Sequence, residues 1–561
     1  MRESHLPNWQ RIASMKRAAI HDSIPKQWLL DNGTLQRCKE QKKLTGSFIE
    51  GLLDPETVEI TTLDSVDIVE KIRSGNFTSL QVMRAFCWRA AISHQLNGCL
   101  LEYFCDDAMI RAEQLDDYYA KHNKTVGPLH GLPLSLKDQF HVQGVDTSMG
   151  YVGWLNSYEG RKGTGKEKVV ESELIRELRS LGGIPFCKTS PVQTLWFGET
   201  NNNIMGYSKN PVNQGLSSGG SSGGEGALQA MKGSPIGAGT DIGGSVSIPA
   251  SFCGLYSIKP SHGRISYQEA ANSSPGQMII NSVVGFMSSS PRSLQLMMAS
   301  LMSTKPWMHD PEIVKMPWRD SEELRQRDQL CFGIFASDGI VSPHPPIARA
   351  LQMTVEALEA EGHKVIIWNP PSHSEASKIH SAFTDADGGA DVHQQLKLSG
   401  EPLIPELRPY FANGPVPPMP LLDFYDLCLK RKDYRRRYLE YWMSTLNQTG
   451  TGRPVDGVIL PVAPTAAVIP AYASTTNVLD FTAVVIPVTT ADSKIDVFNH
   501  SYRPLNELDR QNWQAYDPEK YDGAPCGIQV MGRRLEEEKM LSISQIIADA
   551  LHNYKQQSSQ M

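Results

Sequence analysis

Two serines and a lysine occur in sequence settings suited to acyl transfer. Ser221 lies in GGSSGG and Ser245 in TDIGGS, and the paired glycines before each leave its hydroxyl uncrowded. Lys137 ends the short apolar segment 132–136. On a surface it would be an ordinary solvated charge, but in a dry pocket its ammonium loses a proton more easily and can serve as a base. Together the three side chains could provide a nucleophile, a proton relay and a base.

The glycine loop that leads to Ser245 predicts an anion-binding nest. Successive backbone N–H groups from Ile242 onward, those of Ile242, Gly243 and Gly244, could point into one concavity and stabilise an oxyanion. A phosphate-binding loop is the alternative. The sequence contains no G-x-x-x-x-G-K-[ST] motif, and GGSSGGEG lacks the strand expected before it, so the oxyanion interpretation is favoured.

These segments resemble the amidase signature family. The resemblance rests on GPLHGLPLSLKDQF with Lys137, SSGGSSGGEGAL with Ser221 and GAGTDIGGS with Ser245, and it extends over residues 65–555 to GAPCGIQVMGRRLEEEKML. IPKQWLL and KTSPVQTLWFGETNN are similar in particular to the fungal acetamidase-like branch. The resemblance implies an α/β fold with a large, mixed, twisted β-sheet covered by helices on both faces.

The same resemblance implies a Ser-cis-Ser-Lys triad that hydrolyses a carboxylic acid amide. Neutral Lys137 would take a proton from Ser221, which takes one from Ser245, and Ser245 would attack the carbonyl and form an acyl-enzyme. A free lysine has a pKa of about 10.4, so this mechanism requires burial of Lys137 or a hydrogen bond that favours its neutral form. Leu195 and Trp196 occupy positions that resemble the family's substrate-lining stretch; plain core packing is the other interpretation of both.

Two positions depart from the family pattern. The residue two after the nucleophile, commonly arginine, is Ser247, and the common N-V-P-Q order appears as S-P-V-Q at 190–193. The first departure deprives Asp241 of its usual cationic partner. We therefore expect Asp241 to depend on neutral donors, with Ser247 offering one hydroxyl.

Other chemistries and functions have weaker support. A Ser-His-Asp triad could use His130, His141 or His262, but there is no G-x-S-x-G elbow. Metal-assisted hydrolysis would need H-E-x-x-H or a Cys/His cluster, so we expect no metal and no cofactor. A tRNA-dependent amidotransferase subunit and a catalytically silent binding protein remain alternatives to a stand-alone hydrolase.

Composition limits the partners. The net charge of -7 over 561 residues argues against broad capture of nucleic acid or anionic membrane. Nine scattered cysteines without a C-x-x-C pair indicate reduced thiols, and no segment is apolar enough to span a bilayer. We expect a cytoplasmic enzyme that binds a small amide, with no nucleic-acid or membrane partner; a homodimer is left open.

The hydrophobic pattern predicts one large α/β unit behind a helical extension. Residues 1–65 form the N-terminal extension packed on the core, and residues 66–561 form the catalytic domain. The proline-rich stretch 400–420 is expected to be a stiff loop, either over the substrate entrance or a plain surface connection. The basic run 430–437 is interpreted as a solvated helix face rather than a nucleic-acid contact.

Overall fold

A mixed β-sheet forms the centre of the protein. The computed structural model describes residues 7–319, 329–466 and 474–560. Within them the sheet has eleven strands, in the spatial order β1 (Leu100–Tyr103), β3 (Ile184–Thr189), β2 (Pro133–Lys137), β6 (Ile236–Asp241), β8 (Val283–Ser288), β7 (Tyr256–Lys259), β12 (Ala483–Thr490), β13 (Pro525–Met531), β11 (Gly457–Pro461), β9 (Cys331–Ile334) and β10 (Lys364–Ile367). Strands β3, β2 and β6 run parallel, as do β11, β9 and β10, whereas the strands between them pair antiparallel.

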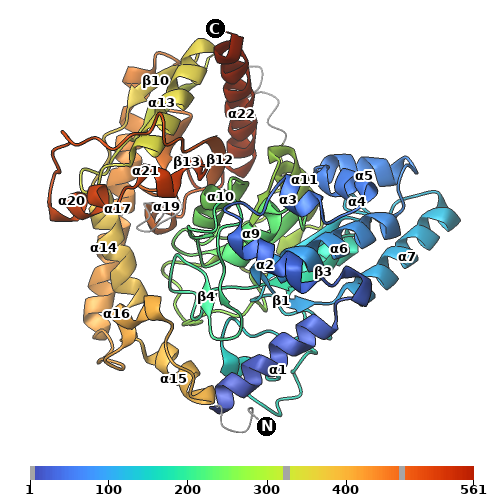
Figure 1. Ribbon diagram of the computed structural model, residues 1–561. Coiled ribbons are helices and arrows are strands. Elements are labelled where there is room, and N and C mark those ends of the chain that lie inside the picture. The colour runs from blue at the N-terminus through green and yellow to red at the C-terminus, as the bar shows by residue number, and fades with distance from the viewer. Residues whose placement is uncertain (1–6, 320–328, 467–473, 561) are drawn as a thin grey trace.

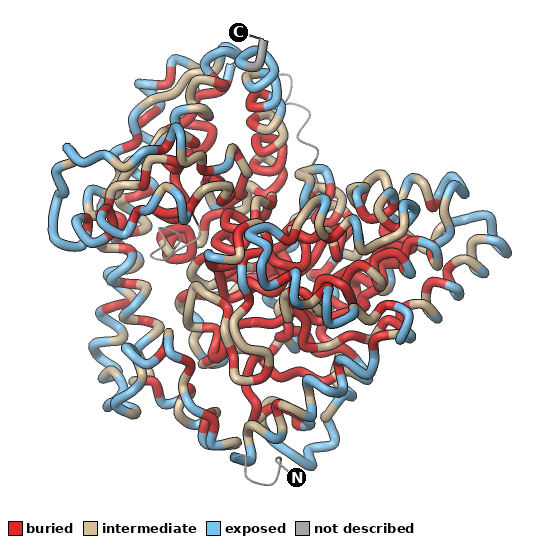
Figure 2. Tube along the Cα trace, viewed as in Figure 1, coloured by how far each residue is buried: buried red, intermediate tan, exposed pale blue. Residues whose placement is uncertain are grey.

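Helices cover both faces of this sheet, so the predicted α/β class is confirmed (Figure 1). Helices α9 (Gly223–Ala230) and α10 (Ser247–Cys253) pack against each other, and α11 (Pro291–Ser303) and α13 (Pro345–Ala360) pack against the C-terminal α22 (Glu537–Gln560). Buried residues concentrate along the sheet and its covering helices (Figure 2). The continuous apolar strands follow from this arrangement, because a strand with both faces covered has no solvent side.

The first helices pack onto the main core. They are α1 (Asn8–Asp22), α2 (Asn32–Glu40), α3 (Ser47–Glu50), α4 (Pro55–Thr62) and α5 (Ser65–Arg73), followed by α6 (Ser79–Asn97), α7 (Cys105–His122) and α8 (Glu173–Ser180). Ile20, Leu44 and Ile60 are buried in the same cluster as the sheet residues, and Trp28 stacks on Trp88 of α6 at 6.1 Å between ring centroids. The extension therefore contributes to the core rather than standing apart from it.

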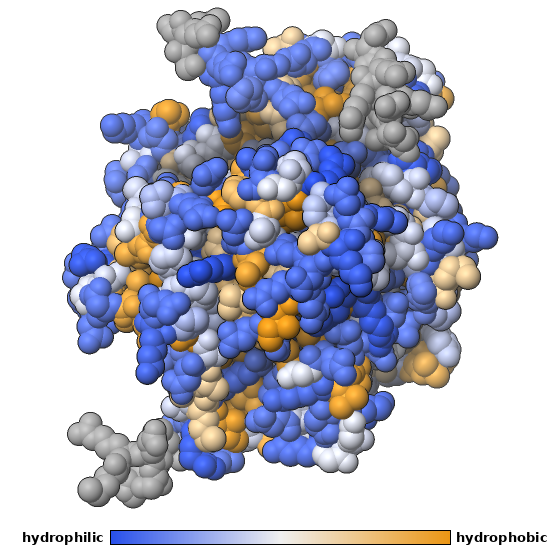
Figure 3. Space-filling model, turned by 90° about the vertical axis from the view of Figure 1, so that its right-hand side faces the viewer, coloured by the Kyte–Doolittle hydropathy of each residue, from blue (hydrophilic) through white to orange (hydrophobic). Residues whose placement is uncertain are grey.

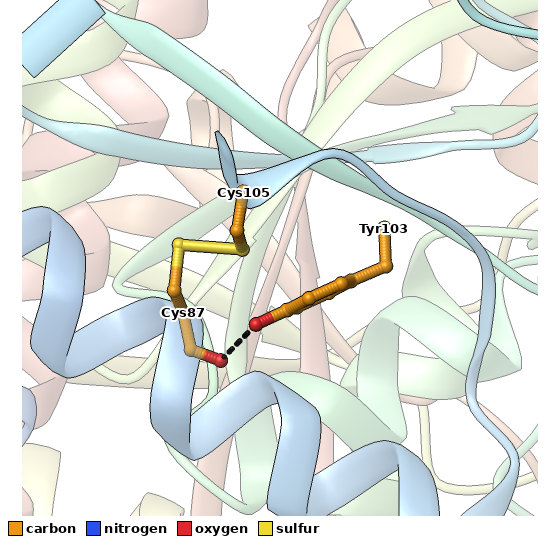
Figure 4. The surroundings of a disulfide bond; sticks show 3 residues. All are labelled: Cys87, Tyr103 and Cys105. Carbon is orange, nitrogen blue, oxygen red and sulfur yellow. Dashed lines mark hydrogen bonds between the residues drawn. A yellow bond between two sulfur atoms is a disulfide. The ribbon is translucent and has the colours of Figure 1, made fainter. Parts of the chain in front are cut away.

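Two cysteines expected to be free thiols are paired. Cys87 on α6 and Cys105 at the start of α7 form a disulfide, with their Cα atoms 5.9 Å apart, and the Tyr103 hydroxyl donates to the Cys87 carbonyl beside it (Figure 4). The prediction of uniformly reduced cysteines is wrong here. Packing of α6 on α7 brings together residues whose spacing in the sequence has no recognisable motif, and cysteine usage no longer supports a cytoplasmic location.

The helices between β10 and β11 lie along one side of the molecule (Figure 1). They are α14 (His373–Thr384), α15 (Ala390–Ser399), α16 (Arg408–Phe411), α17 (Leu421–Ser444) and α18 (Leu446–Thr449), and α19 (Ser474–Leu479), α20 (Glu507–Gln514) and α21 (Pro518–Tyr521) follow. The proline-rich stretch is not wholly irregular, because residues 405–411 form a 3₁₀ turn and α16. The basic run lies on α17, which buries Leu427, Tyr434, Tyr438 and Trp442, as a helix with one solvated face requires.

The face of the molecule shown in Figure 3 is mostly hydrophilic. On this face, apolar residues form small separate groups among polar ones (Figure 3). No helix in the described ranges is both long enough and apolar enough to cross a membrane.

Candidate active site

The ends of two adjacent parallel strands position the lysine and the nucleophile loop. β2 pairs with β6 in parallel register, Leu136 opposite Ala238, so that Lys137 at the end of β2 lies beside the end of β6. The chain leaving β6 turns through residues 242–244 to Ser245 and enters α10. Ser221 comes from the loop before α9. Because parallel strands bring their carboxyl ends to one edge, residues 108 positions apart in the sequence meet there.

Lys137, Ser221 and Ser245 come together at this edge. Lys137 Nζ lies 2.6 Å from Ser221 Oγ. The Ser222 N–H donates to the Ser245 carbonyl at 3.3 Å and ties the two serine loops to each other. The peptide bond between Gly220 and Ser221 is cis. All three side chains are buried, and Ser245 is the most accessible of them at 8% exposed, as a residue that must meet a substrate should be.

A chain of hydrogen bonds fixes one N–H of Lys137. Gln139 Nε2 donates to the Ala271 carbonyl at 2.8 Å, and a carbonyl can only accept, so Gln139 Oε1 is the atom that faces Thr240. Thr240 therefore donates its hydroxyl proton to Gln139 at 2.5 Å, and its oxygen accepts an N–H of Lys137 at 3.0 Å. This commits one N–H of Lys137 to Thr240, so that in neutral Lys137 the second N–H and the lone pair remain for the contact with Ser221.

Burial makes this lysine a usable base near neutral pH. Removal from solvent lowers the pKa of Lys137 to about 7, against the opposing attraction of the Asp241 carboxylate. The loss of hydration penalises the ammonium more than Asp241 can recover. Lys137 therefore releases its proton near neutral pH far more readily than a solvated lysine does, which the predicted role requires.

The nest before Ser245 has free N–H groups, but not at every expected position. The Gly244 N–H donates to Asp241 Oδ1 at 2.8 Å and is engaged inside the loop. Among the described contacts, the N–H groups of Ile242, Gly243 and Ser245 have no protein acceptor. The N–H groups of Ile242, Gly243 and Ser245 are thus available to an oxyanion and that of Gly244 is engaged, and the roles of Ile242, Gly243 and Gly244 as oxyanion donors stay predictions.

Asp241 holds the loop through neutral donors. Its carboxylate accepts from the N–H groups of Gly244 and Val246 at 2.8 Å, from the Ser247 N–H at 3.3 Å, and from Asn477 Nδ2 at 2.9 Å. Ser247 contributes its backbone rather than the expected hydroxyl. Asn477, on α19, was not identified from the sequence, and it supplies the side-chain donor that arginine supplies in the family pattern.

Arginine at position 247 is therefore expected to destabilise the protein. Ser247 is 1% exposed, so an arginine side chain would have to displace packed neighbours. It would gain little in return, because the Asp241 carboxylate already accepts from four donors. We expect Ser247→Arg to lower the melting temperature by several degrees and kcat with it. Thermal unfolding and ammonia release measure both. Ser247→Ala, which keeps the backbone donor, is the control and should stay close to wild type; a more stable arginine variant would contradict this account.

Leu195 and Trp196 line the cavity above Ser245. The cavity has a volume of about 180 Å³, and its other lining residues are Phe197, Gly198, Gly220, Ile242, Gly243, Ser245, Ile248 and His380. The lining is mainly apolar, and among the described residues the side chains on it with polar atoms, beyond Ser245, are the indole of Trp196 and the imidazole of His380. The cavity thus opens onto Ser245 and the glycine loop before it.

The proline-rich segment packs beside this cavity. Ile404 and Leu407 lie in one apolar cluster with Trp196 and Phe197, and the ring of Tyr410 lies 6.1 Å from that of Phe197. Of the two interpretations of residues 400–420, a position next to the substrate entrance is the one that these contacts favour.

The three histidines of the alternative triad have other partners. His130 Nδ1 accepts from the Val126 N–H, His141 contacts Glu159, and the His262 backbone N–H donates to Asp480. None of the three lines the described cavity at Ser245. Sequence reasoning instead missed Gln139, His380 and Asn477. Of these three, only Gln139 could have been found from the sequence, because it lies two residues after Lys137.

The fold and the contact of the buried Lys137 with Ser221 near Ser245 are suited to hydrolysis of an amide. The Amidase family model matches residues 81–541. The chain is 42% identical to an acetamidase of Emericella nidulans, covering 97% of this chain and 99% of the relative, and 40% identical to an acetamidase of Aspergillus oryzae over the same shares. A solved structure of fatty acid amide hydrolase superimposes with a TM-score of 0.88 at 31% identity, covering 97% and 95% of the two chains.

The chain belongs to the amidase family and is an amide hydrolase. The resemblance noted in the sequence is confirmed, including its fungal acetamidase-like character.

Proposed function

We propose that the protein hydrolyses short-chain aliphatic primary amides to the carboxylate and ammonia through an acyl-enzyme on Ser245. The observation that carries this proposal is the contact of the buried Lys137 with Ser221, beside a small apolar cavity that contains Ser245. The site supplies a base, a relay and a nucleophile next to free backbone N–H groups, as attack on an amide requires.

Protons move along the triad in both half-reactions. Neutral Lys137 accepts the proton of Ser221 while Ser221 accepts that of Ser245, and Ser245 Oγ adds to the amide carbon. The oxygen that gains charge is stabilised by the N–H groups of the glycine loop. Ser221 then gives a proton to the departing nitrogen as the C–N bond breaks. In the second half-reaction water takes the place of the amine, loses its proton to the same relay and releases the acid.

Cavity size and lining support a small apolar acyl group. A space of about 180 Å³ is well below the roughly 300–1,000 Å³ of sites for drug-sized ligands. Leu195, Phe197 and Ile248 offer no partner for a charged acyl group, whose burial would be costly. The names of the acetamidase relatives agree with this substrate class.

The wall of the cavity is held rigidly. Thr194 and Leu195 have φ angles of 76° and 67°, which non-glycine residues rarely adopt and keep only when their surroundings impose them. The preceding Gln193 is buried and donates to Glu401 at 2.9 Å, while its side-chain oxygen accepts from the Ile404 N–H. These bonds fix the substrate-facing turn, so chain length should be selected sharply.

The substrate proposal predicts a falling activity series. Over acetamide, propionamide, butyramide, hexanamide and a long-chain amide, we expect kcat/KM to be greatest among the first three and to drop at least tenfold by hexanamide, because each further methylene must displace packed side chains. Ammonia release by the purified chain alone gives the measurement.

A variant with a larger cavity provides the control. Trp196→Ala should move the preference toward longer amides while acetamide turnover falls by less than tenfold. A flat series in wild type, or a preference for the long-chain amide, would contradict the proposed substrate. Release of ammonia only when a partner protein is added would instead indicate an amidotransferase subunit, and no release at all a binding protein.

A further inference from the structure

A histidine from a distant helix contacts the oxyanion loop. His380, on α14, places its Nε2 2.8 Å from the carbonyl oxygen of Ile242 and lines the cavity that contains Ser245. We propose that His380 is a positioning residue for the oxyanion hole: by holding the Ile242 carbonyl it aims the N–H of Gly243 at the substrate oxygen.

The chemistry of the contact fixes the direction of the hydrogen bond. A carbonyl oxygen can only accept, so Nε2 carries the proton and donates to Ile242. The carbonyl of Ile242 and the N–H of Gly243 belong to one peptide unit, in which they point in opposite directions because the unit is planar and trans. Restraining the carbonyl therefore restrains the N–H, and drawing electron density toward the carbonyl makes that N–H a better donor.

The imidazole also packs directly on this peptide. A Cβ atom built on Gly243 would lie 3.0 Å from Cε1 and Nε2 of His380, closer than nearly all real contacts of this kind. Glycine at position 243 is therefore needed for the imidazole ring to contact the loop, in addition to providing a backbone N–H.

Contacts between α14 and α17 fix the helix that carries His380. Its His373 hydrogen bonds to the Tyr438 hydroxyl of α17 at 3.1 Å, and Glu375 pairs with Arg437 of the same helix. Burial lowers the pKa of His380, against the opposing effects of its bond to Ile242 and of the carboxylates of Asp241 and Asp385. The group facing the loop at neutral pH is therefore a neutral N–H donor, which orients the peptide without bringing a positive charge close to the loop.

Two substitutions separate the donor from the ring. His380→Phe keeps an aromatic ring and removes the N–H, whereas His380→Gln keeps an N–H donor. We expect the phenylalanine variant to lose about tenfold to 100-fold in kcat with KM changed less than threefold, because removing one oxyanion donor outright costs about 10²–10³. The glutamine variant should recover most of that loss.

A binding measurement tests the same point without turnover. A short aldehyde adds to the serine and places an oxyanion in the hole, whereas the corresponding primary alcohol cannot. The ratio of aldehyde to alcohol affinity should fall in His380→Phe by the same factor as kcat. An unchanged ratio, a loss confined to KM, or a glutamine variant as impaired as the phenylalanine variant would overturn the proposal.

His373→Phe is the matched control, because it alters a buried histidine of the same helix that contacts α17 and not the loop. It should lower the melting temperature and leave the aldehyde-to-alcohol ratio within twofold of wild type. A ratio that falls as far as in His380→Phe would mean that helix position, not the Ile242 contact, sets the effect. The inference rests on the proposed hydrolase: a wild-type protein that releases no ammonia removes that function, whereas equal kinetics in all variants remove only the role of His380.

Discussion

Ser245→Ala is expected to lower kcat by about 10⁴-fold or more, because no other hydroxyl among the described residues that line the cavity can form the proposed acyl-enzyme. Ser245 lines the cavity, follows the free N–H groups of the loop, and is the most accessible of the three triad side chains. Ser221 is 1% exposed and contacts Lys137, an arrangement suited to a relay rather than to attack. The folded stability of the alanine variant should be close to that of wild type, since only one partly accessible hydroxyl is lost.

Ammonia release and covalent labelling test this prediction together. A fluorophosphonate should label Ser245, as shown by peptide mapping, and Ser245→Ala should lose the label. Ser251→Ala, on the same α10 helix, is the matched control and should keep both the label and the activity within a few-fold. A label on a different serine, or an alanine variant that still turns over amide at a tenth of the wild-type rate, would reassign the nucleophile.

The three residues of the proposed triad could be selected from the sequence because the features that single them out are local. Each serine stands directly after two glycines, and Lys137 ends an apolar run, so the residue types needed for acyl transfer can be recognised within short segments. The parallel pairing of β2 with β6 then needs only the alternation of strands and helices. The large sheet and the helices that cover it follow from the same alternation.

The supporting residues could not be predicted because their contacts are long-range. His380 and Asn477 meet the glycine loop across 138 and 236 residues of sequence, respectively. Neither stands in a motif, and a lone histidine or asparagine is more often a satisfied structural residue than a functional one. The disulfide between Cys87 and Cys105 escaped for the same reason, since only the packing of two helices brings the pair together.

Ser247 illustrates a finer limit. The sequence shows which side chain replaced the arginine, and so directs attention to the hydroxyl. In the folded protein the backbone N–H of Ser247 donates to Asp241 Oδ2 instead, and Asn477 Nδ2 donates to Asp241 Oδ1. Side-chain substitution thus did not leave Asp241 short of donors, because backbone groups and a distant amide were available to it.

Lys137→Met should abolish most activity and remove the acid limb of the pH profile. With the pKa of Lys137 at about 7, the neutral base becomes rare below that pH, so kcat/KM of wild type should fall about tenfold per unit there and level off above pH 8. Methionine cannot accept the proton of Ser221 at any pH. A wild-type profile that is flat from pH 5 to 9 would remove Lys137 as the base.

The same substitution should make the folded protein more stable near neutral pH. In the unfolded chain Lys137 ionises at about 10.4, so between pH 7 and that value the unfolded state holds a proton that the folded site has released. The free energy of unfolding of wild type therefore rises with pH across this window. Methionine has no proton to release, so the variant does not lose the stability that wild type loses by keeping Lys137 neutral. The expected gain is on the order of 4 kcal/mol at pH 7, shrinking as the pH approaches 10.

Denaturant unfolding of both proteins between pH 7 and 9.5 measures this difference. Lys188→Met is the matched control, because Lys188 is an equally buried lysine on the adjacent strand β3 but pairs with Asp138 at 2.5 Å. Its loss leaves a buried carboxylate without its cation, which costs about 3–5 kcal/mol. If Lys137→Met raises the free energy of unfolding and Lys188→Met lowers it, then the neutral Lys137 required of a base destabilises the folded protein. Destabilisation in both variants would mean that Lys137 is held as an ordinary buried cation, and the proposed relay would lose its base.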